Sequence, residues 1–154
     1  MQRKALVWVM ARLAPAAPGA SSRVCVLLLK RGQDRGGDWQ PVTGGVEPTE
    51  SFDEGAAREA TEETGFPCRE PLIDLGFQTS FTGRWGPAVE RSFLAVLHLN
   101  GQESLPATIR LPAPRLDPSE HTAFQWTTPE EALQRLVHEA HRESLALALR
   151  AWVR

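Results

Sequence analysis

The chain has 154 residues, which is about the size of one protein domain. Apolar residues make up 42% of it and charged residues 23%, a composition that excludes a disordered chain, a collagen and a coiled coil. The formal net charge of -2 lacks the basic excess of a dedicated nucleic-acid binder, and no apolar run is long enough to span a bilayer. We therefore expect residues 1–154 to form a single domain that binds neither a nucleic-acid polymer nor a membrane.

Two cysteines, Cys25 and Cys68, are too few for a disulfide framework and lack the spacing of a metal site. They favour a reducing compartment, so we expect a cytoplasmic protein. The N-terminus imitates a secretory signal, because basic residues precede an apolar run. Arg12 limits that run to residues 5–11, which is short for a signal peptide and equally suits a β-strand.

The first half of the chain predicts three strands and a helix. Residues 4–13 and 23–31 are rich in β-forming side chains and are expected to pair, joined by a loop over residues 14–22. Residues 40–47 predict a short strand that enters a glycine turn. The clearest helix covers residues 51–64, because Ser51 and Glu54 form a capping box and Gly65 followed by Pro67 ends it.

The second half of the chain predicts three further strands and a helix. Strands are expected at residues 72–80, 88–99 and 121–127, and the four prolines of residues 105–118 predict an irregular segment. A helix is expected from Pro129 towards the C-terminus, with an interruption near His141. This order of strands and helices predicts an α/β domain whose central sheet is covered by helices.

The predicted helix at residues 51–64 lies in a strongly acidic segment. From Glu47 to Glu63 there are seven acids and one base, Arg58, a local charge of -6. At about 100° per residue, Glu59 and Glu63 project close to the apolar face of the helix. Ionised carboxylates on the core side need a cation, and an all-oxygen set suits Mg²⁺ or Mn²⁺. The alternative is a solvated acidic face, but the core-side placement and the preceding glycine turn favour a metal site.

The same segment contains a specific motif. Gly44, five residues, Glu50, seven residues and then residues 58–66 match the pattern GX5EX7REUXEEXGU, where U is apolar, at every fixed position. The chain thus resembles the Nudix family, with its Nudix box at residues 44–66. The resemblance implies the Nudix fold, an α/β/α sandwich with a central mixed sheet. It also implies hydrolysis of a nucleoside diphosphate linked to another group, with Mg²⁺ or Mn²⁺ as cofactor.

The resemblance also implies roles for individual residues. Glu59 and Glu63 would be the main metal ligands, and Glu62 would be a further ligand or the residue that orients or deprotonates water. The main-chain carbonyl of Thr43 would face a metal. Arg58 would pair with Glu50 and influence the charge of the catalytic carboxylates, while Gly44 and Gly65 would have structural roles. One departure from the family pattern, Pro48-Thr49 in place of a glycine, leaves every acid present.

A narrower resemblance covers most of the chain. Residues 39–47, the segment Ser119-Glu120-His121 and Trp126 are similar to bacterial dihydroneopterin triphosphate pyrophosphatases, which also hydrolyse dNTPs. That branch implies that Glu120 joins the metal site and that Lys4, Arg31 and Thr43 contact phosphates. Pro41 and the prolines of residues 105–118 depart from the branch.

Other side chains have two interpretations each. Trp39 either stacks on a base or pterin or fills a strand end, and Trp85, in an expected loop, either contacts a ligand or packs over the core. Arg31 and Arg91 are candidates for phosphate contacts. The pair His138 and His141 has the wrong spacing for a zinc helix and is interpreted as a solvated helix end.

We therefore expect a cytoplasmic, Mg²⁺-dependent pyrophosphohydrolase, active as a monomer or homodimer. Its substrate would be a nucleoside or pterin triphosphate, a dNTP or dihydroneopterin triphosphate, and its products the monophosphate and pyrophosphate. Two alternatives stay open, namely a Nudix hydrolase of ADP-ribose or dinucleotide polyphosphates and a Nudix module that binds a nucleotide without turnover.

Overall fold

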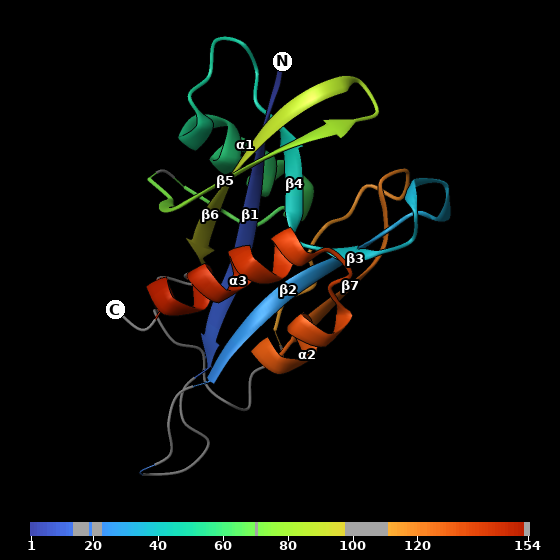
Figure 1. Ribbon diagram of the computed structural model, residues 1–154. Helices are drawn as coiled ribbons and strands as arrows, with labels where there is room; N and C mark the ends of the chain where they lie inside the picture. Colours follow the sequence, from blue (N-terminus) through green and yellow to red (C-terminus); the bar gives the residue numbers. More distant parts are fainter. Residues whose placement is uncertain (14–18, 20–22, 70, 98–110, 153–154) are drawn as a thin grey trace.

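The computed structural model describes residues 1–13, 19, 23–69, 71–97 and 111–152 (Figure 1). In this part of the chain one mixed sheet of seven strands packs with three α-helices. In chain order the elements are β1 (Gln2–Leu13), β2 (Arg23–Arg31), a 3₁₀-helix η1 (Gln33–Arg35), β3 (Trp39–Gln40), β4 (Val42–Gly45), α1 (Phe52–Thr64), β5 (Ile73–Gly83), β6 (Gly86–Val96), β7 (His121–Thr127), α2 (Pro129–Arg135) and α3 (Glu139–Trp152). None of these helices is long and apolar enough to cross a membrane.

Strand β1 is the centre of the sheet. One of its edges pairs in parallel with β6, and the other edge of β6 pairs antiparallel with β5. The other edge of β1 pairs antiparallel with β4 over residues 4–7 and with β2 over residues 10–13. Strands β3 and β7 extend the sheet from β2. Because β2 pairs only with the end of β1, it slants away from it (Figure 1).

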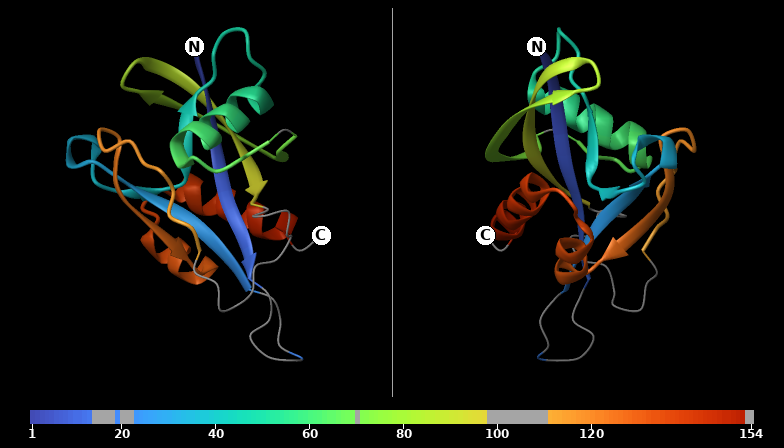
Figure 2. Two further views of the ribbon diagram at one scale, coloured as in Figure 1. Left: turned by 180° about the vertical axis from the view of Figure 1, so that it is seen from behind. Right: turned by 45° about the vertical axis from the view of Figure 1, so that its right-hand side comes forward.

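Helices cover both faces of this sheet (Figure 2). Side chains alternate along β1, so the odd-numbered residues 5–11 pack against α1, while the even-numbered residues 6–10 pack against α3. On the α3 face, the indole nitrogen of the buried Trp8 donates to Ser144 Oγ at 2.7 Å, and Ser144 donates to Ser92 Oγ at 2.8 Å. The predicted α/β/α sandwich with a central mixed sheet is confirmed.

Helix α1 has well-defined ends. The hydroxyl of Ser51 accepts from the Glu54 main-chain N–H at 3.1 Å, and the Glu54 carboxylate accepts from the Ser51 N–H at 2.9 Å, which completes the predicted capping box. Gly65 ends the helix with φ of 76°, a left-handed conformation that favours glycine, and its N–H donates to the Thr61 carbonyl at 2.8 Å. These caps fix where the acids of α1 lie over β1 and β4.

One predicted element differs from the structure. The single strand expected at residues 40–47 is two short strands, β3 and β4, because Pro41 lies between them and has no N–H for the ladder. The interruption of the C-terminal helix expected near His141 is present at residues 136–138, where the backbone of the buried Leu136 is extended (φ -70°, ψ 129°). The expected loop at residues 14–22 and the first part of the irregular segment at 105–118 lie largely outside the described residues. Its later part, residues 111–117, has no helix or strand.

Candidate active site

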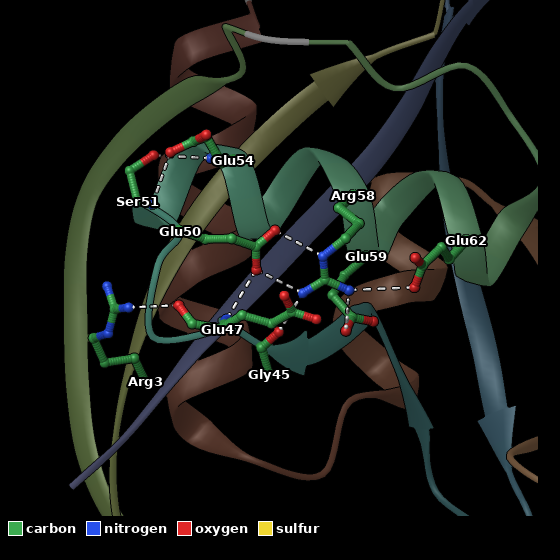
Figure 3. Close-up of polar contacts among 9 residues, drawn as sticks. All are labelled: Arg3, Gly45, Glu47, Glu50, Ser51, Glu54, Arg58, Glu59 and Glu62. Carbon is green, nitrogen blue, oxygen red and sulfur yellow. Dashed lines mark hydrogen bonds and ion pairs between the residues drawn. The ribbon is translucent and has the colours of Figure 1, made fainter.

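Arg58 of α1 ties the helix to the loop that precedes it (Figure 3). Its Nε and Nη2 donate to the two carboxylate oxygens of Glu50 at 2.7 and 2.8 Å, and Nη2 also donates to the Gly45 carbonyl at 2.9 Å. Glu50 in turn accepts from the Glu47 main-chain N–H at 2.8 Å. The hydrogen bonds from Arg58, and then that from the Glu47 backbone, lower the pKa of Glu50 to about 2. The Glu50 carboxylate therefore stays ionised and holds the loop in place.

The same guanidinium also contacts two acids further along α1. Nη1 of Arg58 donates to Glu59 at 3.0 Å and to Glu62 at 3.2 Å. Hydrogen bonding to Glu50 contributes most to a raised Arg58 pKa, so this residue is always charged. One positive charge is thus shared among three carboxylates, and the cluster keeps a negative charge that attracts cations.

Gly44 of β4 lies directly against Glu59. A Cβ at position 44 would lie 2.2 Å from Glu59 Cδ and 2.3 Å from Glu59 Oε2. Non-bonded atoms do not come this close, so the Glu59 carboxylate or the backbone of β4 would have to shift. A neighbouring glycine, Gly45, has open space at the same place. The missing side chain of Gly44 therefore lets β4 and the Glu59 carboxylate approach closely.

Three carboxylates and three cationic side chains line one small polar cavity of about 180 Å³. The carboxylates are Glu59 and Glu63 of α1 and Glu120, which directly precedes β7. Lys4 of β1, Arg31 of β2 and Arg35 of η1 supply the positive charges. The β2–β7 register shifts between Lys30 and Arg31, and such bulges re-aim side chains. The cavity's other lining residues are Gln40, Thr43, Gly44, Gly45 and His121.

Glu63 is the most perturbed acid in this cavity. Burial raises its pKa to about 8, and the negative charges of Glu59 and Glu120 add to the rise. Its Oε2 is buried and has no hydrogen-bond partner among the described residues. Burial also raises the pKa of Glu59, although Arg58 opposes this. A bound cation would relieve both the repulsion and the missing partner.

This oxygen-only donor set fits the hard cations Mg²⁺ and Mn²⁺. Within the described part of the chain, no three His, Cys, Asp or Glu side chains already converge as metal ligands do. Glu59 and Glu62 instead contact Arg58. Glu59 already lines the cavity while it accepts from Arg58, whereas Glu62 faces Arg58 and is not part of the described lining of this cavity.

Two larger spaces adjoin the small cavity. One, of about 470 Å³, lies on the α3 face of the sheet and shares Lys4, Arg31, Gln40 and Thr43 with it. The other is an open groove of about 580 Å³ that shares Lys4 and Gly45 and is lined by the exposed Trp85. The parts of a ligand that extend beyond its phosphates thus have room on either side of Lys4.

The structure brings together six of the predicted phosphate and metal residues, namely Lys4, Arg31, Thr43, Glu59, Glu63 and Glu120. It places two other predicted substrate residues elsewhere. Trp39 packs on the α3 side of the core, with the Arg135 guanidinium 5.5 Å from its ring centre. Arg91 donates to Asp74 at 2.7 Å and lies 5.2 Å from the ring centre of Phe52. Among the described residues, the linings of these three spaces include neither Trp39 nor Arg91.

Several residues that line the cavities were not predicted from the sequence. The interpretation of His138 and His141 as a solvated helix end is wrong for His141, which is half-buried, lines the larger cavity and has a pKa lowered to about 4 by burial. His141 belongs to the first turn of α3, directly after the helix break at residues 136–138, and lines this cavity together with residues of β5. Gln40 and Glu90 were missed as well. An acid inside the apolar stretch of β6 was the one available signal for Glu90.

Helices lie on both faces of the mixed sheet, and the acidic helix α1 lies beside the charged cavity. The family described as NUDIX domain matches residues 12–148, and the chain belongs to this family. Nudix hydrolases generally use a divalent metal such as Mg²⁺ and bind small-molecule nucleotides.

Relatives of this chain carry different names. An octanoyltransferase of Myxococcus xanthus is 39% identical over 133 residues, which are 84% of this chain and 34% of that protein. The chain thus spans about a third of the length of this curated relative. A C. elegans Ap4A hydrolase complex matches with a TM-score of 0.72 and 20% identity over 99% of this chain and 98% of that one. The E. coli dihydroneopterin triphosphate pyrophosphohydrolase matches with a TM-score of 0.64 and 22% identity over 93% and 91%. At these identities the two structures show the shared fold.

Proposed function

We propose that this chain is a Mg²⁺- or Mn²⁺-dependent pyrophosphohydrolase that cleaves a nucleoside or pterin triphosphate to the monophosphate and pyrophosphate. One observation carries the proposal, namely that Glu59, Glu63 and Glu120 share a small cavity with Lys4 and Arg31. Hydrolysis of a phosphoanhydride needs negative groups to hold a metal and positive groups to hold phosphates, and this cavity has both.

Glu59 and Glu63 are proposed as the main metal ligands, with Glu120 and the main-chain carbonyl of Thr43 as further ligands. The unpartnered Oε2 of Glu63 and the lining of the cavity support this choice. The bound metal would supply the positive charge that offsets the phosphate oxygens while water attacks phosphorus.

The other residues act by position and charge. Lys4 and Arg31 bind phosphate oxygens, since each lines both the small cavity and its larger neighbour. Arg58 holds Glu59 and the loop of Glu50 in place. Glu62 is proposed as a further ligand or as the residue that orients or deprotonates the attacking water, since its side chain is 60% exposed and one of its oxygens accepts from Arg58.

The first test is a substrate panel with Mg²⁺ and then Mn²⁺, in which chromatography resolves the products. The panel contains the dNTPs, dihydroneopterin triphosphate, ADP-ribose and diadenosine polyphosphates. Turnover of a triphosphate with release of pyrophosphate would support the proposal, while release of orthophosphate or no turnover would contradict it. Glu63→Gln should lose turnover by orders of magnitude while staying folded. If the chain only binds a nucleotide, this variant would keep its ligand affinity and the wild type would show no turnover.

A second candidate is hydrolysis of ADP-ribose or a dinucleotide polyphosphate by the same metal site. The open groove with Trp85 favours it, because a second nucleoside could lie there and stack on an exposed indole. The similarity to the fold of an Ap4A hydrolase also supports it. Preferred cleavage of these compounds in the same panel would select this candidate over the first.

The curated relative's name gives a further contrast. The name octanoyltransferase belongs to a protein about three times as long as the matched segment. The carboxylate-lined cavity of this chain instead fits phosphoanhydride chemistry. That residues 1–154 form one domain, that the protein is cytoplasmic, and that it acts as a monomer or homodimer remain predictions.

A further inference from the structure

The larger cavity lies on the α3 face of the sheet, beside the small one. Its lining includes Thr79 and Phe81 of β5, Glu90 of β6, Lys4 of β1 and His141 of α3, and Glu90 pairs across the sheet with Lys4 and with Thr79. Its volume of about 470 Å³ is typical of a small-molecule site. Because Lys4 lines both cavities, a molecule with its phosphates at Lys4 would extend its other end along Glu90 and Phe81.

Glu90 is a buried acid without a partner. Only 9% of its surface is exposed, and it makes no hydrogen bond or ion pair within the described part of the chain. Lys4 is its neighbour across the β1–β6 pair, but the Lys4 ammonium lies 5.8 Å from the ring centre of Phe81 and forms no ion pair with Glu90. Burial raises the Glu90 pKa, and Lys4 partly opposes this rise. A carboxyl group buried at a cavity wall without a partner weakens the fold unless a ligand supplies one.

We propose that Glu90 is a specificity-determining residue whose carboxylate accepts two parallel N–H bonds from the substrate's ring. The ring would carry a ring N–H directly beside an exocyclic amino group, an edge that guanine and dihydropterin share. This inference deepens the proposed function and rests on it for the phosphate end of the molecule. The neighbouring Phe81 ring offers an apolar surface on which such a planar ring can lie.

The other common rings fit an ionised Glu90 poorly. Adenine and cytosine present a ring nitrogen acceptor beside the amino group, and a carboxylate repels an acceptor. Thymine and uracil place carbonyls on both sides of a single ring N–H. A site with a buried acceptor pair therefore discriminates strongly, because the wrong ring leaves the carboxylate desolvated and unpaired.

The test uses Glu90→Gln, which replaces two acceptors with one acceptor and one donor. Binding of dGMP and dAMP is measured by calorimetry in EDTA, so that hydrolysis plays no part. We expect the wild type to bind dGMP at least about tenfold more tightly than dAMP, and Glu90→Gln to lose this preference, since a bidentate pair gives discrimination of this order. Glu143→Gln, an exposed acid on α3, is the matched control and should bind like the wild type.

Several results would overturn the proposal. These are equal binding of dGMP and dAMP by the wild type, a wild-type preference for dAMP, or an unchanged preference in Glu90→Gln. Glu90→Asp keeps a carboxylate and should keep a weaker preference for dGMP, which tests the same point if the glutamine variant fails to fold. A purely structural role would lower the urea midpoint of Glu90→Gln, whereas removal of a buried unpaired acid should leave it unchanged or raise it.

Turnover then separates the two possible sources of the ring. The value of kcat/KM for dGTP is compared with that for dihydroneopterin triphosphate, and the higher value shows which of the two rings the site prefers. If dGMP binding depends on Glu90 but no triphosphate is cleaved, the proposed function is wrong and the role of Glu90 stands. If triphosphates are cleaved without any dependence on Glu90, the role of Glu90 is wrong and the proposed function stands.

Discussion

The close approach of Gly44 to Glu59 allows a sharp test of the metal platform. In Gly44→Ala the new Cβ would lie 2.2 Å from Glu59 Cδ, so the carboxylate must retreat by about 1.2 Å to reach an ordinary contact of 3.4 Å. A misplacement of about 1 Å in a catalytic group lowers rates by roughly 10²-fold, or about 2.7 kcal/mol in activation free energy. We expect kcat for the best substrate to fall by about this factor.

The expected effect on stability is much smaller. Glu59 is a flexible side chain at the edge of the cavity, so the free energy of unfolding should change by less than about 1 kcal/mol. The assay is steady-state release of pyrophosphate, together with urea unfolding and calorimetric titration with Mn²⁺. Gly45→Ala is the matched control, because its Cβ would meet nothing within 4 Å and its activity should stay close to that of the wild type.

A double-mutant cycle identifies the cause of the loss. If Gly44→Ala acts through Glu59, it should cost little further activity in a Glu59→Ala background. The reasoning would be refuted by a folded Gly44→Ala protein with wild-type kcat and Mn²⁺ affinity. An equal loss from Gly45→Ala would refute it as well, since the effect would then come from the backbone of β4.

Three further predictions concern charge, geometry and packing. The pKa of Glu63 is about 8 in the fold against an ordinary value of 4.5, so its contribution to stability is complete below about pH 4.5 and is lost as the pH rises through 8. Urea midpoints in EDTA should fall over this range, and Glu63→Gln should flatten the slope. Arg58→Lys should lower kcat by roughly tenfold or more, because lysine cannot make the two parallel hydrogen bonds to Glu50. A wild-type kcat in this variant would contradict the prediction. Ser144→Ala leaves the buried Trp8 N–H without its acceptor, so it should lower the free energy of unfolding by about 1–3 kcal/mol and leave kcat unchanged.

The sequence was most informative where the structure is local. The caps at Ser51 and Gly65, the ion pair of Glu50 with Arg58 and the core-side placement of Glu59 and Glu63 all lie within one contiguous segment. Helical periodicity is enough to place such residues relative to one another.

Residues whose position depends on strand pairing were harder to predict. Lys4 meets Glu90 only because β1 pairs in parallel with β6, and no pattern in the sequence gives that register. Arg91 is adjacent to Glu90 in the chain, so it faces the opposite side of the sheet and contacts Phe52. Trp39 similarly faces the core beside Arg135. For Trp39 this placement agrees with the second of its two interpretations, a packing residue at a strand end, and the strand face places both side chains outside the described linings of the three cavities.

The position of the larger cavity on β5 and β6 also bears on how the ligand specificity of this protein can evolve. Thr79, Phe81 and Glu90 line the larger cavity from β5 and β6, and none of them belongs to the acidic segment at residues 44–66. On the proposed role of Glu90, substitutions at these three positions would alter which ring is accepted while every carboxylate of α1 is kept. A gene duplicate could then acquire a new ligand through this hairpin alone, and a laboratory library limited to these positions would sample new ligands while the proposed metal ligands are retained.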